Sequence, residues 1–297
     1  LYAQLPPAPR DEPAALLRGQ GRKLLLFADS RQDAAFTAHY LERTANNILY
    51  RRLILQMMTE DPNARSGELR IGSLADILQG RVRHLGVLDE NADLYARRME
   101  TLKWLTRELT DLGFSQGLEG LGLLHFRLAR PPAARPPAPL LAPPWNLSAA
   151  EAWTLIEMLL DTVRRRGGVR FPDGVEPTDD FFAPRNRPCF LVRQLAEGKP
   201  RSRPYVLQGW SPIRGANTRT DLLEKLLLRV APSLDAAGRR VEARRALDGL
   251  WSYLQSGPWA GFWHSETKPG DGLVYQLRAD CWEWAVADDG AVAADGA

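Results

Sequence analysis

The feature that most constrains the fold is an apolar run near the N-terminus, with the sequence Lys23-Leu24-Leu25-Leu26-Phe27-Ala28. Short apolar runs without alternation are typical of strands buried on both faces of a parallel sheet. Polar residues follow this run directly. Alanines and leucines at helical spacing then predict a long helix over residues 31–59, for which Ser30 is a suitable N-cap. A strand, a polar turn and a helix form half of a β-α-β unit, so we expect an α/β segment here.

Two proline-rich tracts punctuate the chain and indicate domain boundaries. The first precedes every periodic segment, so residues 1–21 are expected to be a linker. Residues 131–145 contain seven of the 22 prolines, and this density argues against a helix or a central strand because proline lacks a backbone donor. We predict a second linker there. Residues 288–297 offer little to bury and are expected to be a disordered tail.

Periodicity predicts a mainly helical region after the second tract. Helices are expected over residues 147–166, 220–230 and 239–256. Leu147-Ser148 should open the first of these helices, and Gly167-Gly168 should end it. Two strands, Trp259–His264 and Leu273–Leu277, should follow and flank a turn at residues 269–272. Helices followed by a hairpin are typical of a winged-helix module. Before the tract, a helix over 91–112 and a strand over 121–128 are also predicted, so the expected fold class is α/β plus mainly α.

The charge balance gives weak evidence for a nucleic-acid partner. The chain has 39 Lys and Arg against 36 Asp and Glu, a net charge of +3 and a pI near 9.0. Arginines cluster at residues 164–166 and at Arg239, Arg240, Arg244 and Arg245. Guanidinium groups bind phosphate in a two-pronged geometry, but arginine-rich surfaces also occur without a ligand. We keep both interpretations and treat the last four arginines as candidate secondary DNA contacts.

Several site classes are missing from the sequence. No Gly-x-x-x-x-Gly-Lys-Ser/Thr loop is present to hold nucleotide phosphates. The four histidines are scattered without metal spacing, so no metal site and no catalytic residue is predicted. Two cysteines, Cys189 and Cys281, fit a reducing compartment, and no apolar run is long enough to cross a bilayer. We therefore expect a cytoplasmic protein without a membrane partner.

The polar turn after the apolar run is the candidate binding site. The free amides and the positive dipole end of a following helix favour an anion such as a nucleic-acid phosphate. Ser30 would add a hydroxyl group and Arg31 a guanidinium group. The alternative is that Asp29 and Ser30 merely cap the helix while Arg31 lies in solvent.

Residues 23–36 resemble motif IV of superfamily 2 helicases, which opens the second RecA-like domain. The stretch is most similar to large bacterial DEAD/DEAH-box helicase-like proteins that carry a cysteine-rich C-terminal region. Further sequence segments resemble the connecting region of that group, so that the resemblance spans residues 20–285. These segments are residues 115–123, 159–165, 209–212 and 217–219.

The resemblance implies that the chain is part of an ATP-driven motor that acts on DNA, with RNA as the alternative nucleic acid. Motif IV contacts the phosphate backbone, which implicates Asp29, Ser30, Arg31 and Gln32. Residues 22–130 would be a partial second RecA-like domain with a helical insertion, and residues 146–287 a winged-helix-like domain. The phosphate loop, the Mg-binding acidic box and the arginine finger of the family are missing. The chain is thus expected to be an internal fragment that does not hydrolyse ATP by itself, with ATP and Mg held by the full-length parent and the remaining motor domains as partners.

Two other functions remain open. A non-enzymatic winged-helix DNA-binding adaptor would share the arginine clusters but leave the apolar run unexplained. A small-molecule enzyme on a Rossmann-like sheet would need a glycine-rich first turn, which residues 29–32 lack. Tryptophans near the predicted hairpin could serve as stacking platforms for bases, although we favour a role in the core and in interfaces with the missing domains. They are Trp251, Trp259, Trp263, Trp282 and Trp284.

Overall fold

A computed structural model describes residues 31–85, 87–88, 92–110, 117–183, 187–194, 208–213 and 215–287, without the side chains of residues 31–43, Ala45, His84 and Gln208. The chain divides into two compact units, Leu1–Tyr50 and Arg51–Ala297. Helix α1, Arg31–Glu60, crosses this division and confirms the helix predicted over 31–59. The predicted strand over residues 23–28 lies outside the described residues. The account below concerns the second unit.

The N-terminal part of this unit is helical. It contains the second half of α1, α2 (Pro62–Arg65), α3 (Ile71–His84) and α4 (Leu94–Thr110). Their apolar faces meet in a core that includes Met57, Leu78 and Leu105, each fully buried. The helix predicted over 91–112 is confirmed for residues 94–110. Helix α3 was not predicted, although its apolar residues repeat at helical spacing.

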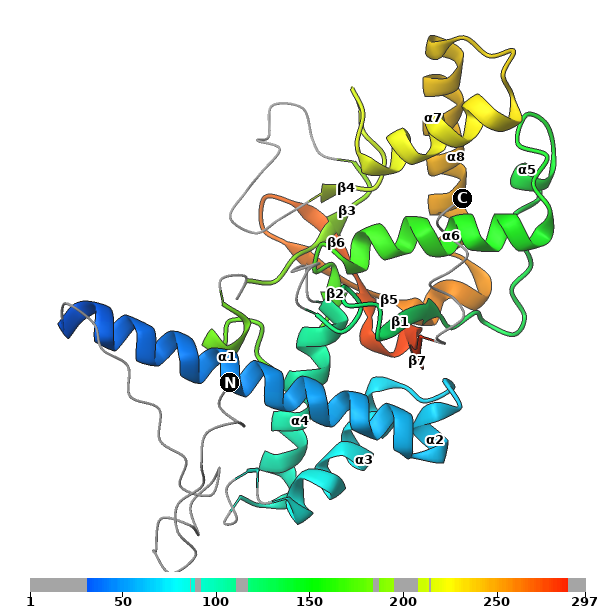
Figure 1. The fold of residues 1–297 in the computed structure, drawn as a ribbon. Coiled ribbons are helices and arrows are strands. Elements are labelled where there is room, and N and C mark those ends of the chain that lie inside the picture. The colour runs from blue at the N-terminus through cyan, green and yellow to red at the C-terminus, as the bar shows by residue number, and fades with distance from the viewer. Residues whose placement is uncertain are drawn as a thin grey trace, which may run out of the picture. The chain divides into compact units, whose positions relative to one another are not determined.

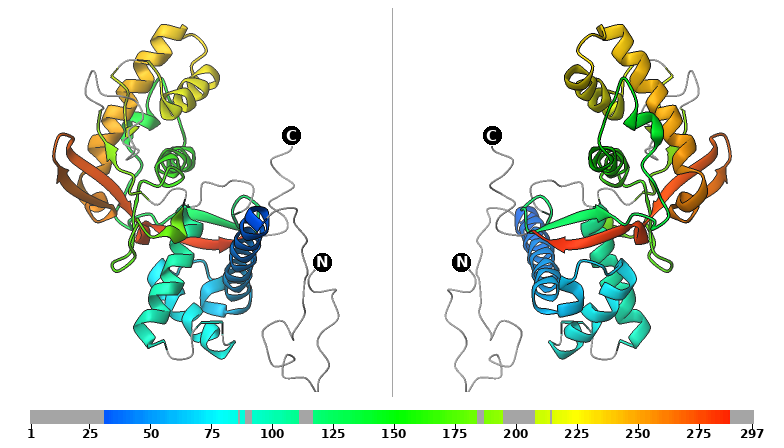
Figure 2. Two further views of the ribbon diagram at one scale, coloured as in Figure 1. Left: turned by 90° about the vertical axis from the view of Figure 1, so that its left-hand side faces the viewer. Right: turned by 90° about the vertical axis from the view of Figure 1, so that its right-hand side faces the viewer.

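A two-stranded sheet joins distant parts of the chain. Strand β1 (Leu124–Leu128) pairs antiparallel with β7 (Trp282–Val286), in a register that sets Phe126 opposite Trp284. The two strands run side by side in Figure 2. The strand predicted over 121–128 is confirmed for residues 124–128, whereas β7 was not predicted.

The second proline tract is packed against the rest of the unit. Within it, α5 (Ala138–Leu141) forms one helical turn, and Leu140 and Trp145 are buried. The expectation that prolines exclude a helix here was therefore wrong. Pro139 lies at the start of this turn, where no backbone donor is needed. The predicted domain boundaries, including the linker role of residues 131–145, stay predictions.

Helix α6 (Ala149–Arg164) begins with a complete capping box. The Ser148 hydroxyl accepts from the backbone N–H of Glu151, and the Glu151 carboxylate accepts from the backbone N–H of Ser148. Gly167 follows the helix with φ of 76°, a conformation that favours glycine. The helix predicted over 147–166, with its start and stop signals, is confirmed.

The C-terminal part consists of a helix pair and a sheet. Helices α7 (Thr218–Val230) and α8 (Ala236–Leu254) pack together (Figure 1) and confirm the helices predicted over 220–230 and 239–256. Strands β5 (Trp263–Lys268) and β6 (Gly272–Arg278) form the predicted hairpin. Strand β6 also pairs with β2 (Val169–Arg170) and β3 (Leu191–Val192), and β3 pairs with β4 (Gln208–Gly209). The hairpin thus belongs to a five-stranded sheet.

The first strand of the predicted hairpin was placed too early. Residues Gly257–Phe262 form the 3₁₀ helix η5, and β5 begins only at Trp263. Pro258 lies at the start of η5, where a proline is favourable in a helical turn. The aromatic residues that indicated a strand here pack inward from η5 instead, since Trp259 is fully buried.

The structure is a mixed α and β fold with more helix than sheet. The five tryptophans considered as stacking platforms are all buried, which confirms their assignment to the core. Aromatic contacts connect elements there, such as that between Trp251 of α8 and Trp263 of β5, with ring centroids 5.7 Å apart. None of the described helices combines the length and apolar character that a membrane span requires.

Candidate functional site

The predicted phosphate-contact turn lies at the edge of what the structure describes. Asp29 and Ser30 fall outside the described residues. Arg31 and Gln32 form the first turn of α1, and their side chains are not described. The roles of these four residues therefore stay predictions.

The four candidate arginines on α8 have different surroundings. Arg239 donates from Nη1 to the carbonyl of Leu234, just before the helix. Arg240 Nε lies 2.8 Å from Glu224 Oε1 on α7, and this hydrogen bond raises the pKa of Arg240. Both arginines thus stabilise the local structure around the start of α8.

The second pair of arginines differs more strongly in exposure. Arg244 donates from Nη2 to the carbonyl of Gly215 at 2.7 Å. The Arg245 side chain is 82% exposed, and its nearest carboxylate oxygen, from Glu242, is 3.8 Å away. Of these four arginines, Arg245 is therefore the one best placed to bind an external anion.

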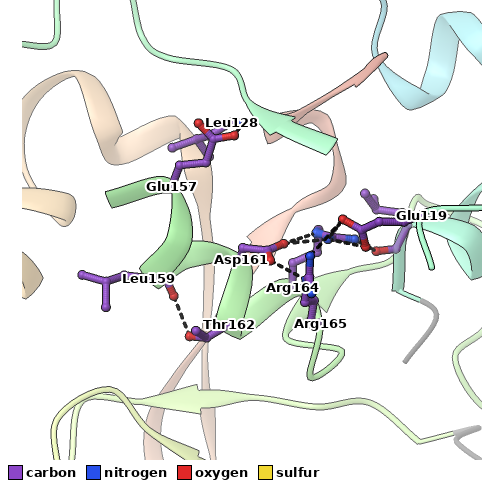
Figure 3. Close-up of polar contacts among 9 residues, drawn as sticks. Glu119, Leu128, Glu157, Leu159, Asp161, Thr162, Arg164 and Arg165 are labelled. Carbon is purple, nitrogen blue, oxygen red and sulfur yellow. Dashed lines mark hydrogen bonds and ion pairs between the residues drawn. The ribbon is translucent and has the colours of Figure 1, made fainter. Parts of the chain in front are cut away.

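The most elaborate polar arrangement centres on Arg164 at the end of α6, a residue that we had counted with the surface clusters. Its side chain is fully buried. Nη2 donates to both carboxylate oxygens of Glu119 at 2.7 and 2.8 Å, and Nε donates to Asp161 Oδ1 at 2.7 Å (Figure 3). Nη1 donates to the carbonyl of Leu109 at 2.9 Å, near the end of α4, where backbone carbonyls lack helical partners.

Aromatic rings complete the surroundings of Arg164. Its guanidinium carbon lies 4.4 Å from the ring centre of Phe126 on β1 and 5.3 Å from that of Trp282 on β7. A guanidinium group stacks favourably on such rings. Glu157, one helical turn before Asp161, accepts from the backbone N–H of Leu128 at 3.3 Å, and burial raises the pKa of this carboxyl group. Helix α6 is therefore attached to the β1–β7 pair at two points, through the rings that contact Arg164 and through the bond between Glu157 and Leu128, of which Figure 3 shows the second.

A second buried arginine attaches α7 to the other side of α6. Arg219 donates from Nε to the carbonyl of Trp210 at 2.9 Å, from Nη1 to Thr162 Oγ1 at 2.9 Å, and from Nη2 to the carbonyl of Gly209. Burial, with a smaller contribution from Arg166, lowers the pKa of Arg219 to about 9. The acceptors are carbonyl and hydroxyl oxygens without charge, so no carboxylate offsets the lowering of the pKa by burial. Helix α6 thus connects the β1–β7 pair with the α7–α8 pair.

Sequence reasoning missed both buried arginines as structural residues. A signal for Arg164 was present, because Asp161 precedes it by three residues on a predicted helix, and such pairs interact. Nothing local marked Arg219. Among the described residues, no group of histidine, cysteine and carboxylate side chains is arranged to hold a metal ion.

The chain was compared with known families, proteins and structures. No family model matches the chain, and neither curated proteins nor solved structures show a match.

Proposed function

We propose that this chain is part of an ATP-dependent DNA helicase or translocase, in which it contributes contact with the nucleic-acid backbone and coupling between domains. The observation that carries the proposal is the motif IV-like sequence of residues 23–36. The motif needs a helix after its polar turn, and the described part of the chain is helical from Arg31 onward, as part of α1.

The finer assignment of domains belongs to the same proposal. Residues 22–130 are assigned to a partial RecA-like domain, and residues 146–287 to a winged-helix-like domain. The order α7, α8, β5 and β6, two helices followed by a hairpin, supports the second assignment. The coupling role draws support from α6, which contacts both the β1–β7 pair through Arg164 and the start of α7 through Arg219.

Nucleotide chemistry is placed outside this chain in the proposal. The sequence has no phosphate-binding loop, so ATP and Mg²⁺ are assigned to the rest of the parent protein. The DNA strand is expected to meet Asp29, Ser30, Arg31 and Gln32, because helix N-termini and guanidinium groups favour phosphate.

The test uses the parent protein with Arg31→Ala and, as a matched control, Arg52→Ala, an exposed arginine of the same helix. We expect Arg31→Ala to weaken DNA binding and to reduce the slope of log affinity against log salt concentration by about one unit, the value for one lost phosphate contact. Arg52→Ala should leave the slope unchanged. Equal slopes for both variants would assign Arg31 to the solvent-exposed surface.

DNA-stimulated ATP hydrolysis by the parent separates a motor from an adaptor. A parent that binds DNA but shows no stimulated hydrolysis would support the alternative, a non-enzymatic winged-helix adaptor. The exposed Arg245 on α8 fits either function.

A further inference from the structure

A groove of about 770 Å³ lies between the second proline tract and helix α8. The tract and α8 lie next to each other in Figures 1 and 2. Its volume falls within the range of about 300–1,000 Å³ that is usual for small-molecule sites. Among the described residues that line the groove, Arg245 is the one candidate arginine of α8.

One wall of the groove is a single face of α8. Glu242, Arg245, Gly249 and Tyr253 line it at intervals of three or four residues, the spacing that puts side chains on one side of a helix. The first and the last lie eleven positions apart, which corresponds to about 16 Å at 1.5 Å per residue. The groove therefore follows α8 for about three turns.

The other wall consists of proline rings, and two hydrogen bonds fix it to α8. Tyr253 Oη donates to the carbonyl of Arg135 at 2.5 Å, and Trp145 Nε1 donates to Glu242 Oε1 at 3.1 Å. Between these points, Pro136, Pro137, Pro139 and Pro143 line the groove. Prolines restrict the backbone, and both ends of the wall are tied down, so the groove is preformed.

The charge in the groove is positive. Arg135 and Arg245 contribute two guanidinium groups, and within the described part of the chain no carboxylate pairs with Arg135. Glu242 is the one carboxylate among the described lining residues. Its Oε1 accepts from Trp145 and its Oε2 lies 3.8 Å from Arg245 Nη1, so one net positive charge remains on the lining. The groove therefore combines flat apolar surfaces with guanidinium groups that are available to an anion.

We propose that this groove binds an unpaired nucleotide of single-stranded DNA, with the base against the proline rings and Tyr253 and the flanking phosphates on Arg135 and Arg245. A base offers a flat apolar face and a phosphate offers the negative charge, which matches both features of the groove. This inference rests on the proposed function, because it names a second contact for the same strand.

Gly249 provides a way to fill the groove without disturbing the core. It lies in α8, it lines the groove, and a Cβ atom built there meets nothing within 4 Å. Gly249→Leu should therefore fold normally, since leucine also favours helices more than glycine does. Gly80→Leu is the matched control, because Gly80 is an exposed helical glycine on α3 that also has open space around it.

The first experiment measures binding of fluorescein-labelled oligo-dT by anisotropy. We expect Gly249→Leu to weaken binding about tenfold, the loss expected when one base loses its stacking surface, and Gly80→Leu to bind as the wild type does. The melting temperature of each variant is measured alongside. An unchanged affinity in Gly249→Leu, or an equal loss in both variants, would overturn the proposal.

The second experiment tests the charges. Arg135→Gln and Arg245→Gln should each reduce the salt slope of oligo-dT binding by about 0.7, the value for one lost phosphate contact on a single strand, whereas Arg229→Gln, an exposed arginine of α7 outside the groove, should not. A wild-type chain that binds no DNA contradicts the proposed function together with the groove. DNA binding that survives in all groove variants contradicts the groove alone. The variants can also be tested with a proline-rich peptide as the probe. If Gly249→Leu lost affinity for this peptide but kept its affinity for oligo-dT, the groove would be assigned to a protein partner and the proposal would be overturned.

Discussion

Arg164 Nη2 donates to both carboxylate oxygens of Glu119, a residue 45 positions earlier in the chain. This pair connects the end of α6 with the segment that leads into β1. The same guanidinium group reaches Asp161, the carbonyl of Leu109 and two aromatic rings. A single buried side chain thus holds α4, α6 and the β1–β7 pair together.

Removing the charge at this point should destabilise the protein. Arg164→Leu removes the charge-assisted hydrogen bonds to Glu119 and Asp161, which keep Arg165, and it leaves the carbonyl of Leu109 without its side-chain donor. Loss of such bonds costs about 1.5–3 kcal/mol. The free energy of unfolding, measured by denaturation in urea, checks this value. Arg165→Leu is the control, because Arg165 contacts the same carboxylates but its side chain is 36% exposed, and we expect a loss below about 1 kcal/mol. Equal losses would contradict a special role of Arg164.

The ion pair between Lys103 and Asp179 should make stability depend on pH. Lys103 Nζ lies 2.6 Å from Asp179 Oδ2, and this hydrogen bond raises the pKa of Lys103 and lowers the pKa of Asp179. A carboxyl group with a lowered pKa stabilises the fold above its unfolded value of about 3.9, and this stabilisation is lost as the pH falls through the folded value. The raised pKa of Lys103 adds stability that is lost as the pH rises through its folded value.

Lys103→Met tests this dependence. We expect a shallower loss of unfolding free energy between pH 7 and pH 3, because Asp179 then keeps only its bond from the backbone N–H of Phe181. Asp179→Asn should flatten the dependence of the unfolding free energy on pH at least as far. A Lys103→Met curve that parallels the wild-type curve would show that the pair contributes nothing measurable.

Local signals predicted helices well. Ser148 as N-cap and Gly167 after the last turn gave both ends of α6, because capping depends on residues close in sequence. The cluster at residues 164–166 shows the limit of such reasoning. Arg164 is buried, whereas Arg166 donates to Thr218 Oγ1. The acceptor Glu119 and the rings of Phe126 and Trp282 come from distant segments, so no pattern near Arg164 could reveal them.

Strands were harder to predict for the same reason. Strand β7 is five residues long and depends on pairing with β1, which lies far away in the sequence. The run at Trp259 has the aromatic composition of a strand, but Pro258 starts a 3₁₀ turn there. The groove could not be predicted either, because the proline tract was interpreted as a linker and its packing on α8 depends on Trp145, Glu242 and Tyr253.

The two cysteines should react slowly in the folded protein. Both are buried, and burial raises the pKa of Cys281 to about 12. Since the thiolate is the reactive form, alkylation by iodoacetamide at pH 8 should proceed much more slowly than in denaturant. Cys189→Ala isolates Cys281 for this measurement, which mass spectrometry can follow. A native rate close to the denatured rate would show that the region around η6 (Ala279–Cys281) opens readily.

The capping box of α6 should contribute measurably to stability. Ser148→Ala removes the hydroxyl group that accepts from the backbone N–H of Glu151, and loss of such a cap costs about 1 kcal/mol. Thr154→Ala, an exposed position within the same helix, is the control and should change the unfolding free energy by less than about 0.5 kcal/mol. Urea denaturation of both variants gives the comparison.

The two ends of α6 should act independently, because Ser148 lies at its start and Arg164 at its end. If the loss in Ser148→Ala is confined to the first turn, the effect of Arg164→Leu stays unchanged, and the two losses of unfolding free energy add in the double variant. A double variant that loses clearly more or less than the sum would show that the two ends of α6 are energetically coupled.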